Sequence, residues 1–387
     1  MYFIGVDWAD SKHDICVLDP EGQIIREFEI SNDQRGFDIL RKRIFRLQDD
    51  DEINIERPDG LIVDWLVRNG YTVYVTPPTS LHHRRPRRSK DDKADAYLLA
   101  YLLRIKDNEC RLLASRSDIV EEMRQLLRAY DDMVREQRRQ GNRLTYLLKQ
   151  YYPSALQLFC QPYRLISLAF LEKYPTPEMA RTASVKDLRQ FLRDNRYSGK
   201  KVDDKAIEMF NLLQAPAPSA EVYTGLMIHV QVLIPLLRHI YHSRTDLRKR
   251  VIKLFPAHPD MEWWNTIPGA QNLTGARLLA WIGDDRGRFP TANTLQATAG
   301  TAPVTRRSGK SRSVEFRHAC SHKLRKAVDD LARQSAKKSQ WAKEYYDAQV
   351  ARGHGSARSY RALGNRWLSI IWKLWQTKTP YDEQIHL

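Results

Sequence analysis

The first 107 residues alternate short apolar runs with stretches of helical periodicity. Apolar or alternating runs of about four to eight residues, bounded by turn-forming residues, predict strands. Such runs occur at 2–6, 13–18, 23–30, 53–56 and 71–76. Apolar residues three and four apart predict helices after the third and each later strand, at 36–47, 60–68 and 87–103. This order of strands and helices predicts an α/β layer built on a mixed sheet.

Two longer stretches have the apolar spacing of coiled coils. At 118–152 the spacing joins Met123, Leu126, Tyr130, Met133, Gln137, Gln140, Leu144, Leu147 and Tyr151, a seam with polar breaks. At 222–255 it joins Leu226, Val230, Leu233, Leu237, Ile240, Arg244, Leu247, Val251 and Leu254, with a kink expected at Pro235. Two such helices separated by an insert predict an antiparallel coiled-coil arm.

The apolar spacing predicts mostly helices in the rest of the chain. The insert at 153–220 contains short stretches punctuated by prolines, with Ser184 as a helix cap. Helical spacing returns later at 273–282, 317–336 and 360–375. We therefore expect three domains: a mixed-sheet domain at 1–107, the arm with its insert at 108–257, and a mostly helical domain at 258–387.

Acidic residues follow two of the predicted strands and open the helix after the fifth. Asp7 ends the first strand, Glu56 ends the fourth, and Asp92 and Asp95 lie one turn apart on the helix. If the first and fourth strands are neighbours, as in a ribonuclease-H-like (RuvC-like) fold, the four carboxylates share one pocket suited to Mg²⁺. Each acid also has a structural explanation, as a turn former, an ion-pair partner or, for Asp91, a helix start.

The charge balance points to a polyanionic partner. The formal net charge is +16 and the sequence pI is about 9.6, which favours nucleic acid, with a membrane surface as the competing polyanion. No apolar run reaches the roughly 18 residues of a spanning helix, and the start lacks a signal-peptide pattern. We therefore expect a cytoplasmic protein with no membrane partner, and four scattered cysteines that serve as reduced packing residues.

Two basic segments and one glycine are candidate nucleic-acid contacts. The first segment, at 81–90, precedes the acidic helix, and the second, at 305–313, lies in the last third. The interpretation as solvated loops stays open for both. Ile267-Pro268-Gly269 resembles the turn of a helix-hairpin-helix, whose amides bind a DNA phosphate. The candidate residues are Arg84, Arg85, Arg87, Arg88, Lys90, Gly269, Arg306, Arg307, Lys310 and Arg312. Ser308 lies within the second segment, as a possible nucleophile or only part of a phosphate-contacting loop.

Six segments together resemble a known family. In chain order they are GVDWADSKHDICVLDPEG, SKDDKADAYLLAYLL, YPTPE, IPGAQNLTGARLLAWIGD, FPTANTLQATAGTAPVTRRSG and KLRKAVDDLA. They resemble the insertion-sequence "one-ten" transposases, whose relatives include the Piv/MooV site-specific DNA invertases. The resemblance covers both ends of the chain and is weak in the middle.

The resemblance implies a RuvC-like domain with four acids (DEDD), a coiled coil and a C-terminal transposase domain with a catalytic serine. By position the acids are Asp7, Glu56, Asp92 and Asp95, and the serine is Ser308, with Ser311 and Ser313 close by. It further implies Mg²⁺, a covalent phosphoserine link to donor or target DNA, a structured bridge RNA as guide, and a homo-oligomer, a dimer or tetramer.

Other functions stay open from the sequence alone. A RuvC-like nuclease would cut branched DNA through metal-activated water, without a serine intermediate. A non-catalytic RNA- or DNA-binding protein would use its acids structurally. An actin-like kinase ranks lowest, because the sequence has no Gly-rich phosphate loops.

Overall fold

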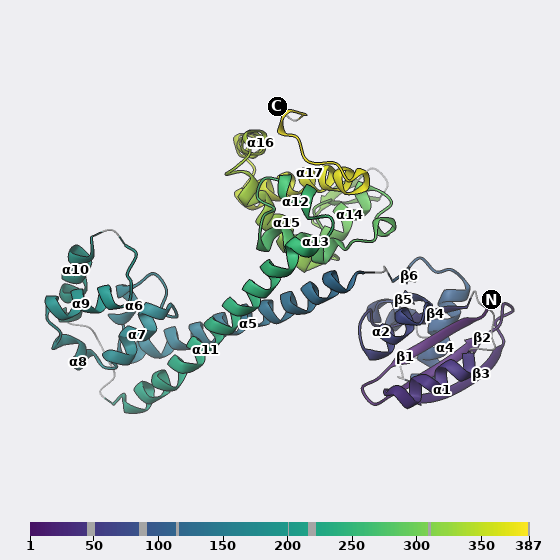
Figure 1. Cartoon of the computed structure of the whole chain (residues 1–387), viewed down its shortest axis with the longest axis horizontal. Helices are drawn as coiled ribbons and strands as arrows, with labels where there is room; N and C mark the ends of the chain where they lie inside the picture. The colour runs from purple at the N-terminus through teal and green to yellow at the C-terminus, as the bar shows by residue number, and fades with distance from the viewer. Residues whose placement is uncertain are drawn as a thin grey trace. The chain divides into compact units, whose positions relative to one another are not determined.

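A computed structural model describes residues 1–44, 51–84, 91–113, 116–199, 201–215, 222–308 and 311–385 (Figure 1). The chain forms two compact units, Met1–Arg116 and Ser117–Leu387. The arm and the helical C-terminal part both belong to the second unit. Their separation into two domains stays a prediction.

The first unit is built on one mixed sheet of strand order β3-β2-β1-β4-β5-β6. The strands are β1 (Phe3–Trp8), β2 (Lys12–Leu18), β3 (Ile24–Ser31), β4 (Glu52–Ile55), β5 (Thr72–Val75) and β6 (Arg111–Leu112). The first three form an antiparallel meander, and β1 pairs with β4 in parallel, in register from Phe3–Glu52 to Val6–Ile55. The predicted neighbourhood of the first and fourth strands is therefore confirmed.

Helices cover both faces of this sheet. The helices are α1 (Gln34–Ile44), α2 (Leu61–Arg68), α3 (Pro78–Arg84) and α4 (Asp92–Arg104). The apolar faces of α1 and α2 pack with Ile4, Val6, Ile15 and Val17 in one core. The opposite face of the sheet contributes Phe3, Cys16 and Leu18, which pack with Ala96, Ala100 and Leu103 of α4. Because side chains alternate along a strand, every second position of β1 faces α4.

Two features hold α4 close to the sheet. Gly5 of β1 lies directly below the helix, since a Cβ built there would be 1.9 Å from the Ala96 carbonyl oxygen. The side-chain amide of buried Asn54, on β4, donates to the Leu99 carbonyl oxygen at 2.8 Å. The small residue and the buried hydrogen bond together fix the height and rotation of the helix on the sheet.

The second unit begins with two long helices that lie side by side (Figure 1). They are α5 (Asp118–Tyr151) and α11 (Thr224–Leu254), and α11 continues through Pro235. None of the predicted seam residues on either helix is exposed. Two polar positions of the seam pair with each other, because Arg244 donates to Gln137. Both predicted helices are confirmed, whereas supercoiling of the pair stays a prediction.

A small helical module joins these helices at one end. It consists of α6 (Ala155–Leu158), α7 (Leu165–Lys173), α8 (Pro177–Arg181), α9 (Val185–Asp194) and α10 (Val202–Gln214). The predicted cap is confirmed: the Ser184 hydroxyl accepts from the Asp187 amide, and the Asp187 carboxylate accepts from the Ser184 amide. Aromatic and aliphatic residues of α5, α7, α9 and α11 form its core.

The C-terminal part packs helices around a tryptophan-rich core. Its elements are η1 (Phe255–Ala257), α12 (Met261–Thr266), α13 (Leu273–Ile282), η2 (Arg286–Arg288), α14 (Ala292–Ala299), β7 (Val304–Ser308), β8 (Ser311–Glu315), α15 (His322–Ser335), α16 (Gln340–Ala351), α17 (Ser356–Thr377) and η3 (Glu383–Ile385). Trp264, Trp367 and Trp375 are fully buried. This core also includes Val120, Met123 and Leu127 of α5, so the base of the arm and the C-terminal helices share one interior.

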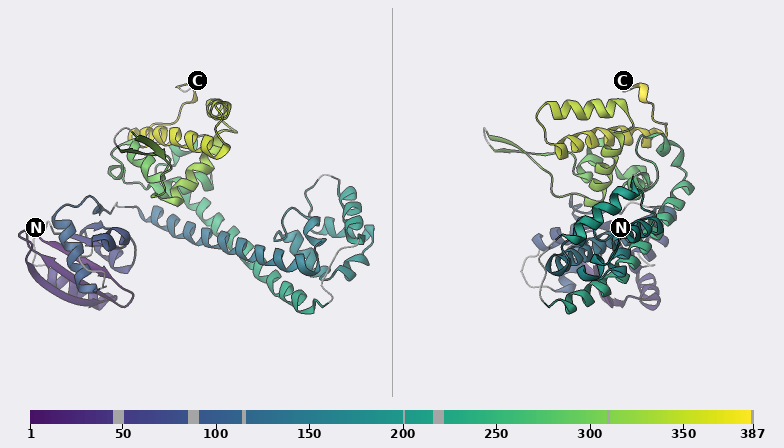
Figure 2. Two further views of the ribbon diagram at one scale, coloured as in Figure 1. Left: turned by 180° about the vertical axis from the view of Figure 1, so that it is seen from behind. Right: turned by 90° about the vertical axis from the view of Figure 1, so that its left-hand side faces the viewer.

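Three sequence expectations need correction. The described residues of the basic segment at 305–313 belong to the paired strands β7 and β8 instead of a loop, and Figure 2 shows this hairpin extending away from the helices of its unit. The helix predicted from 317 begins at His322, because the Ser321 hydroxyl caps it. All four cysteines are free, but Cys160 is exposed and is not a packing residue. No helix in the described ranges could span a bilayer.

Candidate metal centre

Asp7 lies on the face of the sheet that α4 covers. It follows Phe3 and Gly5 at every second position of β1, so its side chain points toward the helix. Only 5% of Asp7 is exposed. The alternation that buries Phe3 therefore also places the Asp7 carboxylate on the α4 face, near the C-terminal end of β1.

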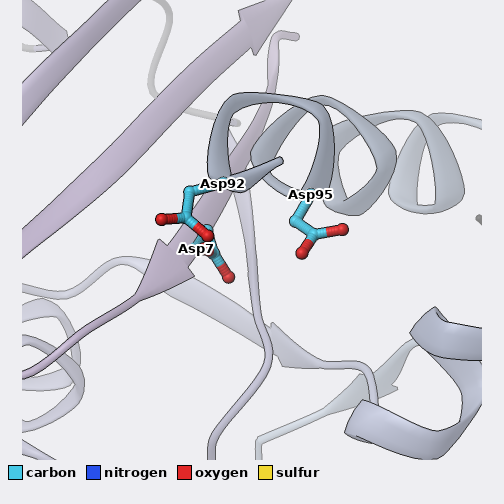
Figure 3. Close-up of side chains that lie close together, drawn as sticks. All are labelled: Asp7, Asp92 and Asp95. Atoms are coloured by element: carbon cyan, nitrogen blue, oxygen red, sulfur yellow. The ribbon is translucent and has the colours of Figure 1, made fainter. Parts of the chain in front are cut away.

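The first turn of α4 supplies two more carboxylates. Asp91 caps the helix, since its side chain accepts from the Lys93 amide, as the predicted helix start requires. Asp95 is 2% exposed, and Asp92, one turn earlier, is more accessible. One carboxylate oxygen from each of Asp7, Asp92 and Asp95 lies within 4.8 Å of the other two. Figure 3 shows the Asp92 and Asp7 carboxylates beside each other, with Asp95 on the same side of the helix.

Glu56 lies at the same edge of the sheet but outside this group of three. It follows β4 directly, and because Val6 pairs with Ile55, its backbone comes next to Asp7. It is partly buried and does not belong to the set of carboxylates within 4.8 Å of one another. The loop after it is held by Arg57, whose guanidinium lies 4.1 Å from the centre of the Trp8 ring. The structure thus brings three of the four predicted acids together.

The sequence reasoning missed one nearby acid, Asp14. It pairs directly with Asp7 across β1 and β2, so both side chains lie on the α4 face. Asp14 lines a cavity of about 240 Å³ with Glu29 and Lys93. Burial raises the pKa of Asp14, the charges of Glu29 and Asp92 raise it further, and Lys12 and Lys93 oppose them. The signal was present in the sequence, because both acids lie equally far from the β1–β2 turn.

The three grouped acids suit a hard divalent cation. Three carboxylates from one strand and one helical turn present only oxygen donors, which Mg²⁺ and Mn²⁺ prefer. Like charges held this close favour binding of a cation. Gly5 and Asn54 hold α4 against the sheet, which keeps Asp92 and Asp95 near Asp7. The residues present therefore fit a metal centre, with Asp14 beside it.

The basic segment before α4 is mostly outside the described residues. Arg85, Arg87, Arg88 and Lys90 lie there, and their contacts with nucleic acid stay predictions. Arg84 is described: it ends α3 and forms an ion pair with Asp107 at 2.8 Å. This ion pair explains Arg84 structurally, and its phosphate contact also stays a prediction.

The second basic segment is the β7–β8 hairpin. Its strands pair from Val304–Glu315 to Ser308–Ser311, so Ser308 ends β7 beside the connection between the strands. Exposed Arg306 forms an ion pair with Glu315 at 3.1 Å, and Arg307 is also exposed. The Ser313 hydroxyl donates to the Glu315 carboxylate at 3.3 Å. Lys310 and the side chains of Ser308 and Arg312 lie outside the described residues.

Gly269 occupies a buried turn between α12 and α13. Its φ is +88°, which favours glycine, and a Cβ there would be 2.8 Å from Gln334 Cβ and 2.9 Å from the Ser335 amide nitrogen. Packing against α15 therefore explains this glycine without a ligand. Its predicted phosphate contact stays a prediction.

Comparisons with known proteins cover both units. A DEDD-type family model described as "Transposase" matches residues 4–153, and a second, "Transposase IS116/IS110/IS902 family", matches 262–347. The mini-circle transposase candidate for IS117 of Streptomyces coelicolor is 30% identical over 99% of this chain and 95% of its own length. The 42 kDa protein of insertion element IS900 from Mycobacterium paratuberculosis is 24% identical over 97% of this chain and 96% of its own. The DEDD match agrees with a ribonuclease-H-like fold for the observed mixed sheet.

Proposed function

Because the chain belongs to the IS110 family of transposases, we propose that it cuts and rejoins DNA through a covalent serine–phosphate intermediate. The observation that carries this proposal is the convergence of Asp7, Asp92 and Asp95 at one edge of the sheet. A second, separate element supports it: a projecting basic hairpin in which Ser308 ends β7.

In the proposed reaction Ser308 is the nucleophile. Its hydroxyl oxygen attacks the scissile phosphorus, a new P–O bond forms to the serine, and the bond to one deoxyribose oxygen breaks. The departing oxygen takes up a proton, while the serine hydroxyl loses one. A hydroxyl of the other DNA end then attacks the phosphoserine, which restores a phosphodiester and releases Ser308. The number of phosphodiester bonds is unchanged, so rejoining needs no external energy source.

We assign the grouped acids, with Glu56 beside them, to metal binding. A bound Mg²⁺ would supply Lewis-acid stabilisation of charge on the phosphate oxygens. Within the chain, Asp7 is fixed by the sheet, and Asp92 and Asp95 are fixed by a capped helix that Asn54 anchors. Preorganised carboxylates of this kind avoid the cost of assembling a site during the reaction.

Trapping of protein–DNA adducts tests the nucleophile. With the full chain and its copurified RNA, Mg²⁺ and DNA carrying the element ends, denaturing gels should show a covalent adduct in the wild type. Ser308→Ala should remove it, whereas Ser311→Ala and Ser313→Ala, as matched neighbouring serines, should retain it. Adducts at normal levels in Ser308→Ala would remove this residue from its role.

The same assay separates the alternative activities. Metal-dependent cleavage without an adduct would favour a RuvC-like nuclease that uses water. Binding without cleavage or strand exchange would favour a non-catalytic nucleic-acid-binding protein. Asp7→Asn should abolish recombination and leave DNA binding intact, and full activity in EDTA would contradict the metal assignment.

We further propose that the active species is a homo-oligomer in which Ser308 of one subunit works with the acids of another. The α5–α11 arm is our candidate for the self-association surface, as a coiled coil. Ser308→Ala and Asp7→Asn are each expected to be inactive. Mixing them should restore part of the activity if the two residues act across subunits, and an inactive mixture of exchanging subunits would contradict a shared site.

A structured guide RNA is the last part of the proposal. The net charge of +16 and the exposed arginines of the hairpin favour binding of polyanions, and RNA is one as much as DNA. A bridge RNA encoded beside the gene should copurify with the protein, and its removal by RNase should abolish recombination. Full activity of RNase-treated protein would contradict RNA guidance.

A further inference from the structure

Two arginines meet at one phenylalanine where the β7–β8 hairpin joins the helices. The guanidinium carbon of Arg325, on α15, lies 4.4 Å from the centre of the Phe316 ring. That of Arg361, on α17, lies 4.2 Å from the same centre. Phe316 follows β8 directly, so both cations are at the root of the hairpin.

Neither cation forms an ion pair with a carboxylate in the part of the chain that the structure describes. The nearest acid on α15, Asp329, is engaged by Arg333 at 3.0 Å. Two like charges on one ring repel each other. Burial lowers the pKa of Arg361 and the charge of Arg325 lowers it further, whereas the charge of Asp329 opposes them and that of Arg358 adds to the lowering.

The surrounding contacts fix Arg325 in place. It donates to the Arg317 carbonyl oxygen, and its Nη2 would lie 2.2 Å from a Cβ at Gly300. Gly300 ends α14 with a φ of +69°, a backbone conformation that favours glycine. Because glycine has no Cβ, this position leaves room for the Arg325 guanidinium. Arg361 is only partly buried, and exposed Arg358 lies one turn away on the same helix.

Guanidinium groups without carboxylates, held by an aromatic ring, are a recurrent means of recognising phosphate. Cation–π contacts orient a guanidinium while its N–H groups stay available for an anion. Each phosphodiester carries one negative charge, so a single one would neutralise only one of the two cations. Neighbouring phosphates of a nucleic-acid strand would neutralise both and relieve their repulsion.

We propose that Arg325 and Arg361, ordered by Phe316, bind neighbouring phosphates of one DNA strand at the root of the β7–β8 hairpin. This inference rests on the proposed function, because it places the strand beside the hairpin that carries Ser308. The site would hold the DNA strand against α15 and α17, and the β7–β8 hairpin would extend along the same strand.

The salt dependence of DNA binding tests the site. The full chain is titrated, without Mg²⁺, against a fluorescein-labelled duplex and against its single strand at several salt concentrations. Each lost phosphate contact should reduce the slope of log K against log salt by about 1. We therefore expect Arg361→Gln to lower the slope by about 1 and the double variant with Arg325→Gln by about 2. Arg361→Lys should retain the slope, because it keeps the charge.

Arg333→Gln is the matched control. Arg333 lies on α15 with its guanidinium 4.4 Å from the centre of the Tyr360 ring, but it already has a carboxylate partner in Asp329. Its loss should leave the slope unchanged. Thermal melting verifies that each variant folds, and Arg361→Gln alone decides the question if Arg325→Gln does not fold.

Three results would overturn the inference: an unchanged slope in Arg361→Gln, equal losses in Arg361→Gln and Arg333→Gln, or a loss of affinity that is the same at every salt concentration. The duplex and single-strand arms show which form of DNA is held. Failure of the proposed function is distinguishable from failure of this inference. If the wild type binds DNA through these arginines but forms no adduct, the phosphate site is supported and the serine mechanism is contradicted.

Discussion

Gly5 of β1 and Ala96 of α4 are in such close contact that a Cβ on Gly5 would lie 1.9 Å from the Ala96 carbonyl oxygen. The obstacle is backbone, which cannot move aside as a side chain does. The helix that carries Asp92 and Asp95 can therefore approach Asp7 only over a glycine. This single contact links the packing of the first unit to the geometry of the three grouped acids.

Gly5→Ala should disturb both stability and metal binding. Overpacking at a buried contact costs about 1–3 kcal/mol, and α4 must move away from β1 to make room. We expect a lower melting temperature and weaker Mg²⁺ or Mn²⁺ binding. Gly225→Ala in α11 is the control, because among the described residues nothing beyond its own turn of helix lies within 4 Å of the added Cβ. A Gly5→Ala variant with the stability and metal affinity of the wild type would contradict this role of Gly5.

The acid cluster should make stability depend on divalent cations. A ligand that binds only the folded state stabilises it by about 2.7 kcal/mol at 100 times its dissociation constant. Mg²⁺ or Mn²⁺ should therefore raise the melting temperature of the wild type. Asp95→Asn should reduce this rise, whereas Asp64→Asn, on α2, should retain it. An equal rise in all three proteins would locate the bound cation elsewhere.

Asp14 should destabilise the protein at neutral pH. Burial, with the charges of Glu29 and Asp92, raises its pKa above the ordinary 3.8, so the folded state binds the proton more tightly. The associated stability is present at low pH and is lost as pH rises through the raised pKa. Asp14→Asn should accordingly melt higher than the wild type at pH 7 and equal it below about pH 3.8.

Two further measurements sharpen the prediction for Asp14. Mg²⁺ should reduce the gain from Asp14→Asn, because a nearby cation offsets the repulsion from Asp92. Asp33→Asn should behave in the opposite way, since hydrogen bonds from Ser31 and the Gly36 amide lower the pKa of Asp33. A lower melting temperature of Asp14→Asn at pH 7 would contradict the assigned environment.

Much of the first unit follows from alternation along the chain. The five longer strands were predictable because each is a short apolar or alternating run. The helices between them were predictable because their apolar residues lie three and four positions apart. The two-residue strand β6 and the short helix α3 carry too few residues for a period to show. Asp92 and Asp95 were predictable as a pair because they lie one turn apart on one helix, and Asp7 was predictable near Glu56 because β1 and β4 are parallel neighbours.

Other parts depend on pairing that no local pattern records. Asp14 joins the edge of the site only because β2 pairs with β1 in one register. The arginines and serines of the β7–β8 hairpin show no apolar alternation, so the sequence indicated a loop. Arg325 and Arg361 lie on different helices, and their meeting at Phe316 depends on helix packing.

Asp284 should stabilise the base of the arm in a pH-dependent manner. Its carboxylate accepts from the backbone amide of Ser117, the cap of α5, at 3.1 and 3.3 Å, and lies 3.5 Å from His258 Nε2. Burial alone would raise the pKa of Asp284, but hydrogen bonds from His258 and Ser117 outweigh it and lower the pKa to about 2.

The sign of this shift fixes the pH window. The folded state favours the ionised carboxylate, so the stability it contributes is present above the ordinary value of 3.8 and is lost as pH falls toward 2. Asp284→Asn should therefore melt lower than the wild type at pH 7, and the difference should close as pH falls from about 4 to 2. Asp285→Asn serves as the neighbouring control, because it removes a carboxylate charge next in the chain whose side chain accepts from the Gly287 amide. A gap for Asp284→Asn that stays constant down to pH 2 would mean that lost packing, and not the ionised carboxylate, causes the destabilisation.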